Sequence, residues 1–302
     1  MKTIFVIGSA NTDMVIKMDR LPKPGETILG GSFLMNAGGK GANQAVAASR
    51  MGGNVTFIAK IGNDIFGKQT TANLKNENIK TDFVFVDEES SSGTALIMVN
   101  SEGENCIAVA PGANAKLSPT DIDMVSSLDT ADVILIQLEI PMQTIVTIAQ
   151  RAKQLGKRVI LNPAPAQFLP DKLFANLFLI TPNETEASLM TGVKVIDEDS
   201  AAKAATFFLA KGVENVIITM GKEGAYFQNK YSKMKIAAPV VKAVDTTAAG
   251  DTFSGSIAVA LTENMEWESA IKFAIQAASI SVTRMGAQSS IPYRKDIQTM
   301  EN

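Results

Sequence analysis

Histidine is absent from the 302 residues of this chain, and its absence removes several kinds of chemistry at once. Ser-His-Asp and Cys-His nucleophile systems need an imidazole, and so does a zinc site built from histidine and cysteine. The most common general base of enzymes is missing as well. Any acid–base step must therefore use a carboxylate, a lysine or a tyrosine.

Cysteine, long apolar runs and an excess of charge are also missing. The single cysteine, Cys106, excludes an internal disulfide and suits a reducing cytosol. No apolar stretch approaches the roughly 20 residues that cross a bilayer, and the first apolar run is too short for a signal peptide. The net charge is −3, and no basic stripe indicates nucleic-acid binding. We therefore expect a cytoplasmic protein that binds neither membrane nor nucleic acid.

Short apolar runs alternate with helical stretches along most of the chain. The runs are nearly all apolar, as in strands buried on both faces, and span residues 4–8, 55–62, 132–138, 158–162, 177–181 and 215–221. Helical stretches lie between them, among them 41–52, 141–156 and 200–212. Repeated strand–helix units predict an α/β fold with a doubly wound, mostly parallel sheet and helices on both faces. No linker divides the chain, so we expect residues 1–302 to form a single domain.

Two segments interrupt this alternation. Residues 13–36 and 93–110 alternate apolar and polar side chains, and the second segment has a turn at Ser101-Glu102-Gly103. Such patterns are typical of antiparallel strands with one covered face. We expect the two segments to form one small antiparallel sheet over the main sheet, serving as a lid or a dimer surface.

Two common nucleotide-binding motifs are only partly matched. Residues 62–69, GNDIFGKQ, follow the P-loop pattern up to Gln69, which replaces the hydroxyl residue that would bind magnesium. This segment is better explained as a strand-to-helix turn with structural glycines. The first strand is followed by GSANTD, which lacks the glycine spacing of a dinucleotide fingerprint.

A glycine-rich segment, NAGGKGANQAVAA, opens the first predicted helix at residues 36–48. Gly39 and its glycine neighbours expose backbone N–H groups at the helix start, and Lys40 and Asn43 lie beside them. Amides, an ammonium and a carboxamide suit a ligand rich in hydroxyl groups. The alternative is a turn that caps the helix and leaves Lys40 in solvent.

Polar residues also follow two predicted strands. Asn11 and Asp13 come after the first strand, and Glu139 comes after the strand predicted at 132–138. Open α/β sheets bind ligands at the carboxyl ends of their strands, so these side chains are candidate ligand contacts. Each of them could instead cap a neighbouring helix.

The segment TPNETEASLMTG, residues 181–192, places Asn183 and Glu186 in the first turn of a predicted helix. Residues three apart lie on the same helix face, so the pair could hold Mg²⁺ through water. The same spacing is that of a capping box, in which Asn183 is the N-cap and Glu186 its partner. The local sequence leaves both interpretations open.

A second glycine-rich segment, VDTTAAGDTFSGS, begins at residue 243. The small side chains of Ala248, Ala249 and Gly250 would let successive N–H groups converge on an anion at a helix start. Asp251, next to them, could accept a proton from an attacking hydroxyl group. The alternative is that Asp251 only caps the helix. That helix is indicated by apolar residues four apart, at Phe253, Ile257 and Leu261.

Together these motifs resemble the ribokinase (pfkB) family of carbohydrate and nucleoside kinases. GGKGANQAVAASRMGG is similar to the N-terminal signature of the family and DTTAAGDTFSGS to its C-terminal one. The resemblance extends over nearly the whole chain, from GSANTDMV to VTRMGAQSSIP. It implies direct in-line transfer of phosphate from ATP, with Mg²⁺, to the 5-hydroxyl of D-ribose, giving D-ribose 5-phosphate.

The resemblance also implies roles for single residues. Asp251 corresponds to the general base, and the N–H groups of 248–251 to the anion hole. The positions that match sugar contacts are Asn11, Asp13, Gly39, Lys40, Asn43 and Glu139. The nucleotide positions are Asn183, Thr219 and Gly221, with Gly250 beside the phosphates, and Glu186 belongs to the pattern associated with magnesium. A K⁺ site is expected at Asp245, Thr247, Arg284, Gly286 and Ser290. The segments 13–36 and 93–110 correspond to the family's lid, which implies a homodimer through the lid.

Three other functions compete with this interpretation. A kinase of the same family could act on deoxyribose, fructose or a nucleoside, although three Tyr and one Trp offer few platforms for a base. A sugar-binding regulator without catalysis should have lost the base or the anion hole, and Gly250 and Asp251 are both present. A nicotinamide-dependent dehydrogenase would need the absent glycine fingerprint.

Overall fold

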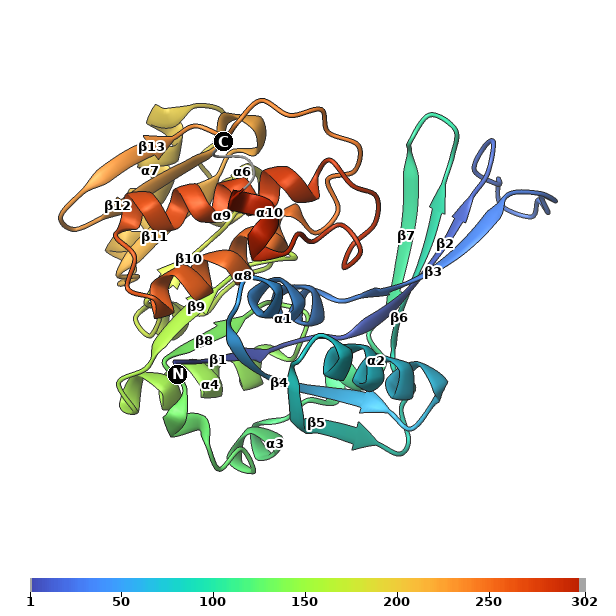
Figure 1. Cartoon of the computed structure of the whole chain (residues 1–302), viewed down its shortest axis with the longest axis horizontal. Coiled ribbons are helices and arrows are strands. Elements are labelled where there is room, and N and C mark those ends of the chain that lie inside the picture. Colours follow the sequence, from blue (N-terminus) through green and yellow to red (C-terminus); the bar gives the residue numbers. More distant parts are fainter. Residues whose placement is uncertain (1, 299–302) are drawn as a thin grey trace.

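The computed structural model describes residues 2–298 and contains a nine-stranded main sheet (Figure 1). The strand order is β13-β12-β11-β10-β9-β8-β1-β4-β5. The strands are β1 (Thr3–Ile7), β4 (Asn54–Gly62), β5 (Lys80–Asp87), β8 (Val133–Ile136), β9 (Arg158–Leu161), β10 (Leu179–Ile180), β11 (Asn215–Thr219), β12 (Ala225–Asn229) and β13 (Lys233–Ile236). The seven strands from β11 to β5 are parallel, and β12 and β13 extend the sheet in antiparallel fashion. The predicted mostly parallel α/β sheet is confirmed.

Both faces of the main sheet are covered, and alternate side chains of β1 enter two separate cores. Ile4 and Val6 belong to one apolar cluster, and Phe5 and Ile7 belong to the other. The first cluster contains residues of α1, α8 and α9, and the second contains residues of α4 and α7. Because each core buries one row of strand side chains, these strands are apolar throughout, as the sequence predicts.

The helices lie in order between the strands (Figure 1). They are α1 (Lys40–Arg50), α2 (Ile65–Asn76), α3 (Pro119–Asp123), α4 (Met142–Gln154), α5 (Asp171–Phe174), α6 (Glu184–Thr191), α7 (Glu198–Ala210), α8 (Ala249–Thr262), α9 (Trp267–Ser281) and α10 (Arg294–Gln298). The described residues also form short 3₁₀ turns, η1 (Gly112–Lys116), η2 (Leu128–Thr130) and η3 (Gly221–Glu223). Within residues 2–298, each helix is too short or too polar to span a bilayer.

The two interrupting segments form one four-stranded sheet that projects from the main body (Figure 1). Its order is β3-β2-β6-β7, with β2 (Asn11–Lys17), β3 (Ser32–Gly38), β6 (Gly93–Val99) and β7 (Asn105–Ala110). The two hairpins are antiparallel as predicted, but the expectation of a wholly antiparallel sheet is wrong, because β2 and β6 pair in parallel. Both strands follow parallel strands of the main sheet, β1 and β5, and therefore leave its edge in the same direction.

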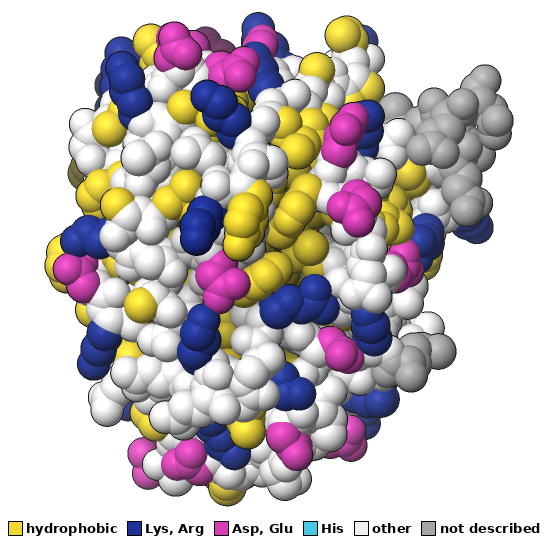
Figure 2. Space-filling view, turned by 90° about the vertical axis from the view of Figure 1, so that its left-hand side faces the viewer, with side chains coloured by type: hydrophobic (Ala, Val, Ile, Leu, Met, Phe, Trp, Pro, Cys, Tyr) yellow, Lys and Arg dark blue, Asp and Glu magenta, His cyan; other side chains and the backbone are white. Residues whose placement is uncertain are grey.

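The P-loop-like segment is a structural turn. Helix α2 begins at Ile65, and Asp64 caps it by accepting a hydrogen bond from the Gly67 N–H. A side chain at Gly67 would collide with the carbonyl of Gly62, so close backbone packing explains both glycines. The end of the molecule on the left of Figure 1 mixes basic and acidic side chains around an apolar area (Figure 2).

Candidate functional site

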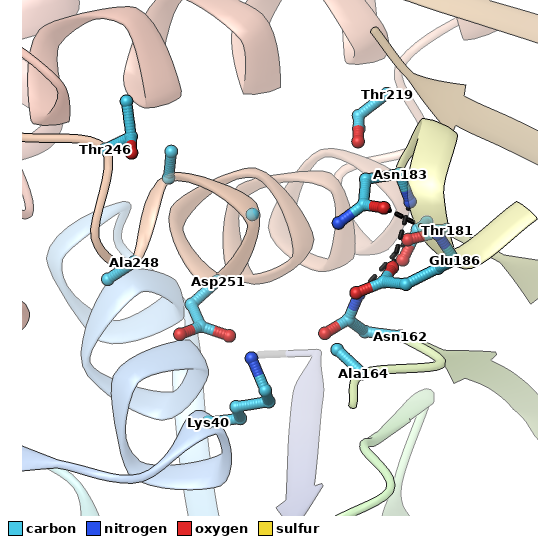
Figure 3. Close-up of a pocket in the computed structure, with 12 residues that line it drawn as sticks. Lys40, Asn162, Ala164, Thr181, Asn183, Glu186, Thr219, Thr246, Ala248 and Asp251 are labelled. Carbon is cyan, nitrogen blue, oxygen red and sulfur yellow. Dashed lines mark hydrogen bonds between the residues drawn. The ribbon is translucent and has the colours of Figure 1, made fainter. Parts of the chain in front are cut away.

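A cavity lies where the carboxyl ends of β9, β10 and β11 meet the starts of three helices, α1, α6 and α8 (Figure 3). Its lining is mostly polar: Lys40, Asn162, Ala164, Thr181, Asn183, Glu186, Thr219, Thr246, Ala248, Ala249, Gly250 and Asp251. Parallel sheets bind ligands at this edge because strand ends and helix N-termini converge there. Eight of the residues singled out from the sequence share this one cavity.

The N-terminus of α8 opens into the cavity without a side-chain cap. Ala248, the N-cap residue, has a left-handed backbone with φ 60° and ψ 11°. Its carbonyl accepts hydrogen bonds from the N–H and the Oγ1 of Thr252, at 2.8 and 2.9 Å, and these hold the turn. The N–H of Ala249 donates to the Thr246 carbonyl at 3.3 Å.

Two amides in the first turn of α8 remain open. Within residues 2–298, the N–H groups of Gly250 and Asp251 have no hydrogen-bond partner, and neither does the N–H of the N-cap residue Ala248. A side chain added at Gly250 would meet no atom within 4 Å, so the glycine leaves free space on the cavity side. Open N–H groups at a helix start attract negative charge, so an anion can bind at this point.

Asp251 is 6% exposed, and helix α1 holds its carboxylate from one side. The Nδ2 of Asn43 donates to Oδ2 and the Nε2 of Gln44 to Oδ1, each at 2.9 Å. The side chain of Lys40 points toward the same carboxylate (Figure 3). Burial lowers the pKa of Lys40, but the carboxylates of Asp251 and Glu139 outweigh burial and leave that pKa above its usual value.

Residues expected to contact a sugar lie beside Asp251. The carboxylate of Glu139 accepts hydrogen bonds from the Ser9 hydroxyl and from the N–H of Lys40. Burial raises the pKa of Asp13 from 3.8 to about 6, with further contributions from the negative charges of Glu139 and Asp251. These acids therefore form one interacting group.

The glycines of the first motif allow two chain segments to approach closely. Gly39 has φ 87°, and a side chain there would collide with the backbone of Ala10 and Asn11. The Oδ1 of Asn11 accepts from the Nδ2 of Asn114 at 2.8 Å, so Asn11 is fixed at the start of β2. A side chain at Gly38 would overlap the carboxylate of Asp13. The motif thus positions Asn11 and Asp13 next to α1.

Asn183 and Glu186 form the capping box that the sequence left open. The Oδ1 of Asn183 accepts from the Glu186 N–H at 2.8 Å, and Glu186 accepts from the Asn183 N–H at 2.9 Å. The Glu186 carboxylate still lies at the cavity wall (Figure 3). Burial raises the pKa of Glu186, while the Asn183 N–H and Lys40 lower it in part.

The other two nucleotide candidates lie on the same side. Thr219 lines the cavity at the end of β11, and Gly221 begins η3 with φ 49°. Gly221 does not line the cavity, and a side chain added there would meet the carboxylate of Glu184 only at ordinary contact distance, 3.9 Å.

The residues expected around a monovalent cation fall into two groups. Asp245 accepts hydrogen bonds from the N–H groups of Thr247 and Gly286, both at 2.9 Å, and so joins two loops. Burial raises the pKa of Asp245, but these hydrogen bonds outweigh burial and lower that pKa below its usual value. Arg284 instead pairs with Asp296, and the Ser290 hydroxyl donates to the Ala287 carbonyl. The described contacts therefore connect Asp245, Thr247 and Gly286, but not Arg284 or Ser290.

Sequence reasoning missed several members of the site. Gln44 contacts Asp251 from within the first motif, where its helical position made it indistinguishable from a core residue. Asn162 follows directly after β9, so the strand-end rule used for Glu139 could have identified it. Thr181 and Ala164 also line the cavity beyond strand ends.

Comparisons with known proteins identify the family of the chain. The pfkB family of carbohydrate kinases matches residues 1–294. The chain is 46% identical to the ribokinase of Haemophilus influenzae over 296 residues, covering 98% of this chain and 97% of that protein. It is 40% identical to the deoxyribokinase of Salmonella typhi over 291 residues, covering 96% of this chain and 95% of that protein. The structure of Arabidopsis thaliana ribokinase complexed with ribose and ATP superposes on this chain with a TM-score of 0.92 at 32% identity. The superposition covers 99% of this chain and 98% of the other.

The family match, the near-complete coverage of both chains and the cavity at the strand ends lead to one conclusion. The protein belongs to the pfkB family of carbohydrate kinases.

Proposed function

We propose that the protein is an ATP-dependent kinase that phosphorylates the 5-hydroxyl of D-ribose to give D-ribose 5-phosphate. One observation carries the chemistry: a buried carboxylate, Asp251, lies beside two open amides at the start of α8. The sugar follows from similarity to proteins named ribokinase, one of them complexed with ribose and ATP. The Salmonella deoxyribokinase, at 40% identity, makes 2-deoxyribose the second candidate substrate.

The sugar is proposed to bind between Asp251 and the start of β2. Asn43 donates its Nδ2 to Asp251, which leaves its buried Oδ1 without a partner among the described residues. A buried unpaired oxygen is costly, so a ligand hydroxyl that donates to it would be favoured. Asp13, Glu139, Lys40 and Asn11 supply further hydrogen-bond groups, with Gly39 leaving room for the close approach.

The reaction is proposed to be a direct in-line transfer. Asp251 accepts the proton of the 5-hydroxyl as the sugar oxygen forms its bond to the γ-phosphorus of ATP. The bond from that phosphorus to the bridging oxygen breaks, and ADP leaves. The amides of Gly250 and Asp251 receive the negative charge that develops on the transferred group. We assign Ala248 and Ala249 to the turn that holds these amides in place.

The nucleotide is proposed to lie along Asn183, Thr219 and Gly221, with its phosphates directed at α8. Within residues 2–298, no three acidic or cysteine side chains are grouped to hold a metal ion by themselves. Glu186 nevertheless fits Mg²⁺, because Mg²⁺ keeps several waters and shares ligands with phosphates. Bound Mg²⁺ would neutralise charge on the phosphates.

A potassium ion is proposed at the loops joined by Asp245. Both oxygens of Asp245 accept N–H groups, so backbone carbonyls near Thr247 and Gly286 are the better ligands, with Arg284 and Ser290 on the neighbouring loop. Replacing K⁺ with Na⁺ should lower kcat several-fold, and equal rates in the two salts would discard this site. The projecting sheet is proposed as a lid over the sugar and as the surface of a homodimer, within a single domain.

The substrate proposal can be tested with a panel of free sugars. D-ribose, 2-deoxyribose, fructose and adenosine are each supplied with ATP, Mg²⁺ and K⁺, and ADP release is measured. We expect the highest kcat/KM with D-ribose, and a product whose phosphate is on carbon 5 by ³¹P and ¹³C NMR. A higher kcat/KM with 2-deoxyribose would identify a deoxyribokinase, and no turnover with any sugar would remove the kinase assignment.

A further inference from the structure

A chain of buried amides connects Asp251 to the middle of the main sheet. Gln44 is 0% exposed, and its Nε2 donates both to Asp251 Oδ1, at 2.9 Å, and to Asn162 Oδ1, at 3.0 Å. Its Oε1 accepts from the Nε2 of Gln137 at 2.6 Å. Gln137 is also 0% exposed and follows directly after β8. Both hydrogens and the oxygen of the Gln44 amide are therefore engaged.

The direction of the Gln44 amide is fixed by two groups that can only accept, the Thr181 carbonyl and the Asp251 carboxylate, whereas the buried Oε1 of Gln137 has no partner among the described residues. The Nδ2 of Asn162 donates to the backbone carbonyl of Thr181 at 3.1 Å, and a carbonyl can only accept. Asn162 must therefore direct its Oδ1 toward Gln44, and the Nε2 of Gln44 must donate the hydrogen bond to it. The same Nε2 then faces Asp251. A reversed Gln44 amide would set oxygen against oxygen at a buried site, which costs about 1–3 kcal/mol per unpaired group.

These hydrogen bonds fix the orientation of the Asp251 carboxylate. Asn43 binds one of its oxygens and Gln44 the other, and the two are consecutive residues of α1. A carboxylate held at both oxygens cannot rotate about its last bond. Its remaining lone pairs can then stay aimed at the cavity, into which Lys40 also points (Figure 3). Reaction rates are sensitive to such alignment, since a misplacement near 1 Å can cost about 100-fold.

We propose that Gln44, anchored by Gln137 and Asn162, is a positioning residue that holds Asp251 in the orientation for proton transfer. This inference rests on the proposed role of Asp251 as the general base. A purely structural role for Gln44 is the competing explanation, since a buried glutamine with satisfied hydrogen bonds can serve only the core. The two explanations differ in what they predict when Asp251 no longer acts as a base.

The test combines Gln44→Met with Asp251→Asn in a double-mutant cycle. Methionine has nearly the shape of glutamine but cannot donate to the carboxylate. In the otherwise unchanged protein, Gln44→Met should lower kcat by about 10–100-fold. The KM values for ribose and ATP should stay within about threefold, because the binding groups are retained. In the Asp251→Asn background the same substitution should change kcat by less than about twofold, since residues acting as a unit are not additive.

Thr144→Val is the matched control. Thr144 on α4 is buried, and its hydroxyl donates to the Leu117 carbonyl at 2.8 Å, so this variant also loses a buried hydrogen bond. Its kcat should be unchanged. If Gln44→Met does not fold, as judged by circular dichroism, Gln137→Met removes the outer anchor and should lower kcat by about 3–10-fold.

The outcomes separate the inference from the proposed function. An equal loss of kcat from Gln44→Met in both backgrounds, or an unchanged kcat in Gln44→Met or in a folded Gln137→Met, overturns the positioning role. Near-normal kcat in Asp251→Asn alone would instead overturn the proposed base, and with it the reason for positioning.

Discussion

Two of the three helices that begin at the cavity, α6 and α8, differ in how the N–H groups of their first turn are bonded. At α6, the side chains of Asn183 and Glu186 form a reciprocal capping box. At α8, no side chain caps the helix, and the N–H groups of Gly250 and Asp251 stay open in the described part of the chain. At α6 the protein's own side chains accept hydrogen bonds from N–H groups of the first turn, whereas at α8 open N–H groups remain available to a ligand.

The open helix start carries a cost that the capped one does not. An L-residue in the left-handed region is disfavoured by about 1–2 kcal/mol, and Ala248 occupies it. The two hydrogen bonds from Thr252 to the Ala248 carbonyl offset part of this cost. Strain at a helix start that faces a cavity is typical of functional sites. The difference between α6 and α8 therefore supports the proposal that the anion binds at α8.

The substitution Asp251→Asn should have the largest effect, and it tests whether the open start of α8 is the reactive one. Asparagine keeps the size of the side chain but cannot accept the sugar proton, so kcat should fall by about 10²–10⁴-fold. Ribose affinity, measured by calorimetry, should change by less than about threefold. The capped helix offers the control: Glu184→Gln, at the first position of α6, should retain normal kcat. A folded Asp251→Asn variant with near-normal kcat would contradict the proposed base.

Gly250→Ala should produce the next largest effect, because it closes the open helix start without disturbing the fold. The added methyl group meets no protein atom within 4 Å and would occupy space needed by the phosphate. We expect kcat to fall by about 100-fold, as for loss of an oxyanion-hole donor. Unfolding free energy should be unchanged or higher by up to about 1 kcal/mol, since alanine favours a helix over glycine. A loss of stability together with activity would point to a structural role.

Glu186→Gln tests whether the capped helix also serves a metal. Glutamine preserves the capping box, so thermal stability should barely change. It removes one negative charge from the cavity, so the Mg²⁺ concentration for half-maximal rate should rise by about 3–10-fold. Asp197→Asn is the matched control, because Asp197 belongs to a capping box at the start of α7. An unchanged Mg²⁺ titration would restrict Glu186 to capping.

The smallest effect concerns pH. The pKa of Asp13 is raised from 3.8 to about 6, by burial first and then by the negative charges of Glu139 and Asp251. Below pH 6 the carboxyl group becomes protonated and loses acceptor capacity for sugar hydroxyls. The ribose KM should therefore rise about 2–5-fold between pH 7 and pH 5.5, while the ATP KM stays constant. The Asp13→Asn variant should have a ribose KM that is higher and flat over the same range, and a parallel rise in that variant would exclude Asp13.

The sequence predicts the main sheet well because its signals are local. The apolar runs at 4–8, 55–62 and 215–221 coincide with β1, β4 and β11 to within two residues at each end. The buried residues Phe253, Ile257 and Leu261 confirm the helix after Asp251. Runs of apolar residues and helix periodicity need no knowledge of distant parts of the chain.

The remaining features depend on contacts between distant segments. The parallel pairing of β2 with β6 follows from where the two insertions leave the sheet, which strand patterns do not encode. Gln44 and Asp251 are separated by 207 positions, and the hydrogen bond between them becomes visible only when α1 and α8 pack together. Asn183 and Glu186 form a capping box by local chemistry, and the sequence could not separate this from a metal role.

The most direct measurement of the central claim is the binding of a transition-state analogue. ADP with aluminium fluoride mimics the transferring phosphoryl group, and its affinity can be measured in the presence of ribose and Mg²⁺. If the open amides of α8 receive that group, aluminium fluoride should tighten ADP binding at least about 100-fold in the unmodified protein, with little tightening in Gly250→Ala. Equal tightening in both proteins would contradict the assignment of the anion site to α8.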